Sequence, residues 1–135
     1  MYDRCYLGYF ECFNAQRYYE AHDVLEHLWL RDGRESDDYS YYKGLIQLAG
    51  GFVHLKLQHA HPLHPKHGRR LHPARRLFLL AAGNIAPYGL SHHGLDLGIP
   101  LMIADSMARS LLEGDFTTNP WSPESAPLLP VPVTE

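Results

Sequence analysis

The sequence predicts an all-α fold of about five helices, and three observations carry this prediction. Apolar residues recur at helical spacing in five separate segments of the chain. Each segment is bounded by residues that cap or break helices. The stretch from Tyr42 to His54 is apolar on nearly every side, which is typical of a central helix that its neighbours bury.

The five helices are expected at residues 3–13, 17–31, about 37–58, 73–86 and 100–113. Ser36 or Asp37 is expected to cap the third of them. Pro62 and Pro65 prevent a regular helix in the histidine-rich segment 59–72, which is therefore expected to be a solvated loop. Metal binding by its histidines is the alternative, although broken spacing defines no ligand geometry.

At 135 residues the chain is expected to form one helical domain over residues 1–114, followed by a proline-rich tail over residues 115–135. The tail holds five prolines, and Trp121 is expected to pin it to the domain. The net charge of −3 argues against nucleic acid as a partner. No apolar run reaches the ~20 residues of a membrane span, and the N-terminus lacks the apolar region of a signal peptide, so a cytoplasmic protein is expected.

The second predicted helix carries polar residues on a face that should be buried. At 100° per residue, His22 shares an arc of about 60° with Tyr18, Leu25 and Trp29, and Glu26 also falls inside the apolar arc. Trp29 is accordingly expected in the core. A carboxylate buried there must be paired or hydrogen-bonded, because burying it alone is too costly.

The third predicted helix has one polar strip, which contains Gln47 and His54. Three glycines interrupt or flank this strip, at positions 44, 50 and 51. Each glycine costs on the order of 1 kcal/mol against alanine in a helix, so a packing reason is expected for them. We expect them to let the helix with His22 and Glu26 approach closely, so that the four polar side chains converge on one buried site.

Taken in order, these residues resemble a known family. The segment Tyr19–Trp29 contains EAHxxLExLW, residues 43–49 read KGLIQLA, and Phe13-Asn14 and His54 flank them. The pattern, over about residues 4–113, is similar to that of DUF309, a family of small all-helical prokaryotic proteins of unknown function. The resemblance implies a single-domain orthogonal helical array and no established reaction. The histidine-rich loop and the proline tail depart from the family pattern.

Two functions are consistent with these residues, and whether the protein is an enzyme stays open. The favoured hypothesis is a non-catalytic binding or interaction module, in which His22, Glu26, Gln47 and His54 form a buried polar network. The alternative is a metal-binding protein or a hydrolase-like metal-dependent enzyme. In it, His22, Glu26 and His54 would bind a divalent metal such as zinc or a non-haem iron, and Glu26 is the candidate catalytic base.

The partner class is defined only broadly by the sequence. Tyrosine is enriched at protein interfaces, and the predicted second and third helices each begin with a pair of them. The tyrosines in question are Tyr18, Tyr19, Tyr41 and Tyr42. A partner protein or a second copy of the chain, giving a homo-oligomer, is therefore expected, and no class of small-molecule ligand is indicated.

Overall fold

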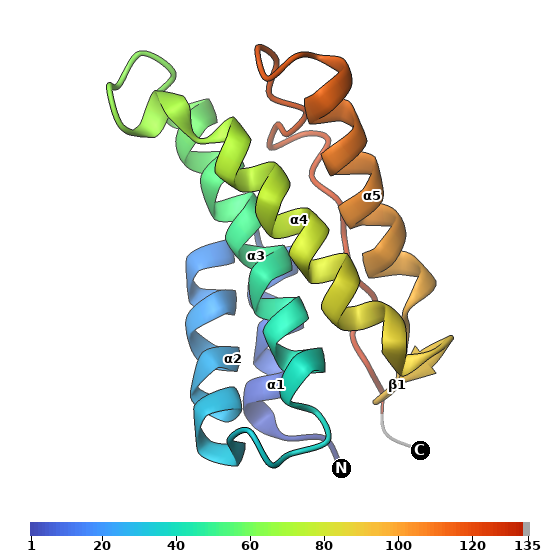
Figure 1. Cartoon of the computed structure of the whole chain (residues 1–135). Coiled ribbons are helices and arrows are strands. Elements are labelled where there is room, and N and C mark those ends of the chain that lie inside the picture. The colour runs from blue at the N-terminus through green and yellow to red at the C-terminus, as the bar shows by residue number, and fades with distance from the viewer. Residues whose placement is uncertain (134–135) are drawn as a thin grey trace.

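The computed structural model, which describes residues 1–133, confirms the all-α array (Figure 1). Its α-helices are α1 (Arg4–Asn14), α2 (Tyr18–Asp32), α3 (Tyr39–Ala60), α4 (Leu71–Ile85) and α5 (Gly98–Glu113). Short 3-10 helices, η1 (His67–Arg69) and η2 (Ala86–Tyr88), flank α4. Every α-helix boundary lies within two residues of its predicted position. The expected cap of α3 was wrong, because its N-cap is Asp38 rather than Ser36 or Asp37, and the Asp38 side chain makes no capping bond.

One element was not predicted. The segment 91–98, which lies between the fourth and fifth predicted helices, contains a two-stranded antiparallel hairpin formed by β1 (Ser91–His92) and β2 (Leu95–Asp96). Each strand has only two residues, too few for an alternating pattern to be visible in the sequence. The hairpin lies at the end of α4 and leads the chain into α5 (Figure 1).

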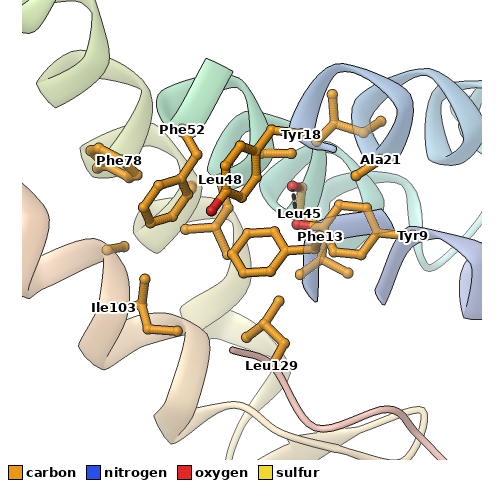
Figure 2. Packing of buried hydrophobic residues seen from close by; sticks show 14 of the residues in the cluster. Tyr9, Phe13, Tyr18, Ala21, Leu45, Leu48, Phe52, Phe78, Ile103 and Leu129 are labelled. Atoms are coloured by element: carbon orange, nitrogen blue, oxygen red, sulfur yellow. Dashed lines mark hydrogen bonds between the residues drawn. The ribbon is translucent and has the colours of Figure 1, made fainter. Parts of the chain in front are cut away.

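Helix α3 is central, as its apolar sequence predicted. It packs against α2 on one side and α4 on another, while α1 packs on α2 and α5 on α4. Ten of its residues are buried, more than in any other helix of the described chain. In the core, aromatic rings from α1, α2 and α4 surround Leu48 and Phe52 of α3 (Figure 2). The buried Tyr9 hydroxyl donates to the Leu45 carbonyl at 2.6 Å, which satisfies the polar end of this side chain.

The glycines of α3 do mark a close helix crossing, but the partner is α4 rather than α2. A Cβ atom added at Gly51 would lie 2.6 Å from the Phe78 ring, and one added at Gly44 would lie 2.7 Å from a side-chain carbon of Ile85. Both neighbours belong to α4. The expectation that α2 approaches at these glycines was wrong, because the sequence shows which face can be approached closely but not which helix approaches it.

The tail packs against the helices over its described part, and the last two residues lie outside the described range. Trp121 is 3% exposed, and its indole Nε1 donates to the Tyr18 hydroxyl at 3.1 Å, so the expected docking is confirmed. Further along, the Asn14 amide exchanges two hydrogen bonds with the backbone of Leu129, at 2.7 and 2.8 Å. Leu129 completes the core beside Phe13 (Figure 2).

Trp29 lies at the edge of the core instead of inside it. Its ring packs against Tyr39 with 5.0 Å between centroids, and the side chain is partly exposed. Its indole Nε1 is shielded from water and has no hydrogen-bond partner among the described residues. The helical wheel placed Trp29 on the correct face of α2. Trp29 lies in the last turn of this helix, however, where only the first turn of α3 is near enough to cover its side chain.

None of the described helices is both long enough and apolar enough to span a lipid bilayer.

Candidate functional site

An open pocket of about 260 Å³ lies between α2, α3 and α4. Its walls come from two residues of α2, five of α3 and one of α4. These residues are Tyr19, His22, Ile46, Gln47, Gly50, Val53, His54 and Leu77. The aliphatic side chains and the glycine form an apolar floor, and the polar side chains stand around it. Gly50 helps to leave this space open, because a Cβ atom there would lie 3.1 Å from Leu77.

The pocket brings together three of the four site residues expected from the sequence. His22, Gln47 and His54 line it, and Glu26 does not. Glu26 lies one turn further along α2, where its carboxylate Oε2 is 3.6 Å from Nε2 of His22. This separation is too long for a good hydrogen bond.

The site is partly exposed, so the expectation of a buried polar network was wrong in this respect. The side chains of His22 and Glu26 are 30% and 38% exposed, and within residues 1–133 no polar or charged residue is classed as buried. The physical reason is the direction of the close crossing. The glycines of α3 admit α4, so the polar edge of α2 stays at the mouth of the pocket.

The polar partners of α3 come from α4 and its N-terminal end. The Asn84 side-chain amide donates to Gln47 Oε1 at 2.7 Å. The Arg70 guanidinium lies 2.9 Å from Nδ1 of His54, and because arginine only donates, this nitrogen accepts. Burial, and secondarily the charge of Arg70, lower the pKa of His54 below its ordinary value. His54 is therefore a neutral imidazole at neutral pH.

His22 has no such partner. Its Nδ1 atom is shielded from water and lacks a hydrogen bond within the described chain, and the Tyr19 ring stacks on the imidazole at a centroid distance of 6.1 Å. A polar atom left in this state is rare in folded proteins, because its lost hydration is not replaced. The α2 wall of the pocket thus holds a hydrogen-bonding nitrogen that residues 1–133 leave unpaired.

The expected metal ligands are not arranged to bind one ion. In residues 1–133, the only group of three or more His, Cys, Asp or Glu side chains whose ligand atoms all lie within 4.8 Å of one another is Asp38, His92 and His93. The set of His22, Glu26 and His54 does not meet this distance. The positive charge of Arg70 beside His54 also opposes a cation there.

Sequence reasoning missed this second cluster, which joins the start of α3 to the hairpin. The two carboxylate oxygens of Asp38 lie 2.7 Å from Nε2 of His92 and 2.7 Å from Nε2 of His93. Burial alone would raise the pKa of Asp38, but the hydrogen bonds from His93 and His92 outweigh it and hold this pKa below its usual value. Asp38 makes no side-chain capping bond to α3, so its carboxylate is free for the histidines.

Residues 6–63 match the model of a family described as "Domain of unknown function (DUF309)". The matched segment begins inside α1, covers α2 and α3 and ends in the histidine-rich loop. It includes all pocket residues except Leu77, and it includes Asp38 but neither His92 nor His93. No curated protein and no solved structure matches the chain.

Proposed function

We propose that this chain, of which residues 6–63 match the model of a family without an assigned function, is a non-catalytic binding module whose pocket between α2, α3 and α4 receives one apolar anchor side chain of a partner protein. The observation that carries the proposal is an open pocket with an aliphatic floor and a polar rim. Such pockets, filled by one large side chain, dominate the binding energy of many protein interfaces.

The size of the pocket favours a single side chain over a larger ligand. Its volume of about 260 Å³ lies below the range of roughly 300–1,000 Å³ that is usual for small-molecule sites. Ile46, Val53 and Leu77 supply apolar contact, and burying a large side chain against them contributes about 1.5–3 kcal/mol. The occupant is therefore an aromatic or long aliphatic side chain.

The rim supports a protein as the partner. Tyr19 is 62% exposed at the edge of the pocket, where it extends the contact surface beyond the anchor. Nδ1 of His22 is shielded from water and has no hydrogen-bond partner within the described residues, so a polar group of the partner can pair with it once the imidazole turns toward the pocket. Gln47 is held in place by Asn84.

The geometry gives less support to the enzymatic alternative. Glu26, the candidate base, does not line the pocket, and the third proposed metal ligand, His54, bonds to a guanidinium. A general base must lie within hydrogen-bond reach of the proton that it removes from a bound substrate.

The test uses analogues of side chains as probes. Indole, p-cresol and toluene are titrated into isotope-labelled protein, and backbone amide shifts are followed by NMR. We expect saturable shifts that cluster at Gly50, Val53 and Leu77. Val53→Phe places a ring in the pocket and should weaken binding at least about tenfold, which corresponds to about 1.4 kcal/mol. Leu112→Phe, a substitution on the exposed surface of α5, is the matched control.

Peptides are then selected from a library for binding to the wild-type protein, and their affinity for both variants is measured, which identifies the chemistry of the partner. The proposal requires selected peptides that share one large apolar residue and that lose affinity for Val53→Phe but not for Leu112→Phe. Probe shifts scattered over other surfaces, or equal binding by both variants, would contradict it. Probe binding that competes with self-association in sedimentation experiments would identify the partner as a second copy of the chain.

A further inference from the structure

The hairpin brings two histidines to one carboxylate with little freedom of position. Ser91 pairs with Asp96 and His92 with Leu95, which leaves His93 and Gly94 as a two-residue turn. Both turn residues have positive φ, 45° and 74°, as a type I′ turn requires. This turn matches the twist of the strands and directs consecutive histidines toward Asp38.

Contacts other than those to Asp38 also hold the hairpin in place. The Tyr6 hydroxyl of α1 donates to the carbonyl of His93 at 2.9 Å. The rings of Tyr41 and Tyr88 pack on the His92 imidazole, with centroid distances of 4.7 and 4.8 Å. The positions of the two imidazoles are therefore fixed by the surrounding tyrosines and not by the carboxylate alone, which is the preorganisation that a ligand site needs.

We propose that Asp38, His92 and His93 form a site for a divalent transition-metal ion, with zinc as the best match. Two imidazoles and one carboxylate are ligands that zinc binds readily in proteins. The ligand atoms of all three residues lie within 4.8 Å of one another. Ligands at about 2.0–2.2 Å from a tetrahedral ion lie roughly 3.3 Å apart, so small side-chain rotations admit the ion.

The site offers an open fourth position. A hollow of about 170 Å³ lies beside it, and Asp38 and His93 form part of its wall together with Tyr2, Tyr6 and Tyr42. The side chains of Asp38, His92 and His93 are 21%, 26% and 36% exposed, so water reaches them. Three protein ligands would leave one position of a tetrahedral zinc ion for water or another ligand.

The protons balance without any redox step. In the metal-free protein each imidazole donates its Nε2 proton to one oxygen of Asp38. Binding replaces both hydrogen bonds by metal bonds, because Nε2 must present its lone pair. An imidazole that was neutral then carries its proton on Nδ1 instead, an imidazolium releases one proton to water, and the carboxylate keeps its charge.

The histidine-rich loop is the competing place for a metal and therefore supplies the control. His61, His64 and His67 are close to one another, and the rings of His64 and His67 stack at 4.5 Å. Nδ1 of His64, however, accepts from two backbone N–H groups, and Nδ1 of His67 contacts Arg70. These two Nδ1 atoms are occupied, and no carboxylate within residues 1–133 completes the set.

The experiment uses full-length protein without a histidine tag, stripped of metal with a chelator. Zinc affinity is measured by competition with a chromogenic chelator, and cobalt(II) reports coordination geometry through its visible absorption. We expect the protein to bind one equivalent of zinc tightly and to give a cobalt(II) spectrum typical of tetrahedral or five-coordinate geometry. Bound zinc should also raise the unfolding temperature. His93→Asn and Asp38→Asn should each weaken zinc binding at least about 100-fold.

His93→Asn separates ligation from folding. It removes the hydrogen bond from His93 to Asp38 but creates an Asn-Gly pair, the preferred dipeptide for this turn, which offsets part of that loss, so the metal-free variant should still fold and unfold cooperatively. The triple variant His61→Gln, His64→Gln, His67→Gln should keep the tight equivalent. Absence of one-to-one binding in the wild type, unchanged affinity in His93→Asn and Asp38→Asn, or loss of the tight site in the loop variant would each overturn the proposal.

Discussion

Helix α3 meets polar side chains at two places, and the two differ in how completely those side chains are paired. At its start, both oxygens of Asp38 accept hydrogen bonds from histidines of the hairpin. More than two turns further along α3, the pocket faces His22 of α2, whose Nδ1 atom is shielded from water and has no hydrogen-bond partner in the described chain. The first place is satisfied from within the described chain, and the second holds one imidazole nitrogen without a partner there.

The comparison teaches that pairing, not exposure, separates the two regions. His22 and His92 have similarly exposed side chains, 30% and 26%. A carboxylate with two short donors is a rigid unit that holds an element or receives an ion. At the pocket, Gln47 and His54 pair with Asn84 and Arg70, whereas Nδ1 of His22 has no hydrogen-bond partner in residues 1–133, so this nitrogen is the polar group that a ligand would explain.

The largest expected effect tests the contact on which both regions depend, the crossing of α3 and α4. Gly44→Leu should lower the free energy of unfolding by about 3 kcal/mol, because the added side chain meets Ile85 and also the backbone carbonyl of Ala81, which cannot rotate away. Urea denaturation measures it. Gly83→Ala on α4 is the control, since open space surrounds that position, and it should stabilise by about 0.5–1 kcal/mol. A neutral Gly44→Leu would refute the close crossing.

The second prediction compares the paired and the unpaired histidine directly, in metal-free protein. His92→Ala should cost about 2 kcal/mol, because Asp38 loses one of two charge-assisted hydrogen bonds and Tyr41 loses ring packing. His22→Ala should change stability by less than about 0.5 kcal/mol, since no hydrogen bond of this side chain is lost. Chemical denaturation of both variants checks this. Equal costs would remove the distinction between the two regions.

The smallest expected effect is a pH dependence that arises at the pocket. Burial and Arg70 lower the pKa of His54, so the unfolded chain binds a proton more readily than the folded one. The free energy of unfolding should therefore be highest above the ordinary pKa of 6.5, and it should fall as the pH drops from there toward the folded pKa. His54→Gln should reduce this slope in denaturation series between about pH 5 and 8.

His27→Gln is the control for the pH series, because His27 is exposed on α2 and should leave the slope unchanged. Arg70→Gln should reduce the slope in part, since it removes the charge but not the burial of His54. A slope that His54→Gln and His27→Gln alter equally would show that His54 is not protected from protonation.

The sequence by itself determined the helices and the central place of α3. These features are local: apolar spacing, caps and breakers act within a few residues, so periodicity reports them. It also indicated that Gln47 and His54 share one strip of α3 and that glycines beside them mark a close crossing. The pocket that joins His22 to this strip follows from the faces of two helices that are adjacent in the chain.

Tertiary structure alone decided which helix fills the glycine face and which polar groups meet. Helical periodicity defines a face but not its partner, and so α4, not α2, supplies the partners of Gln47 and His54. The cluster of Asp38 with His92 and His93 joins positions 54 and 55 residues apart. Its geometry depends on a two-residue turn with positive φ and on the tyrosines that hold the hairpin, and long-range contacts of this kind leave no periodic signal in the chain.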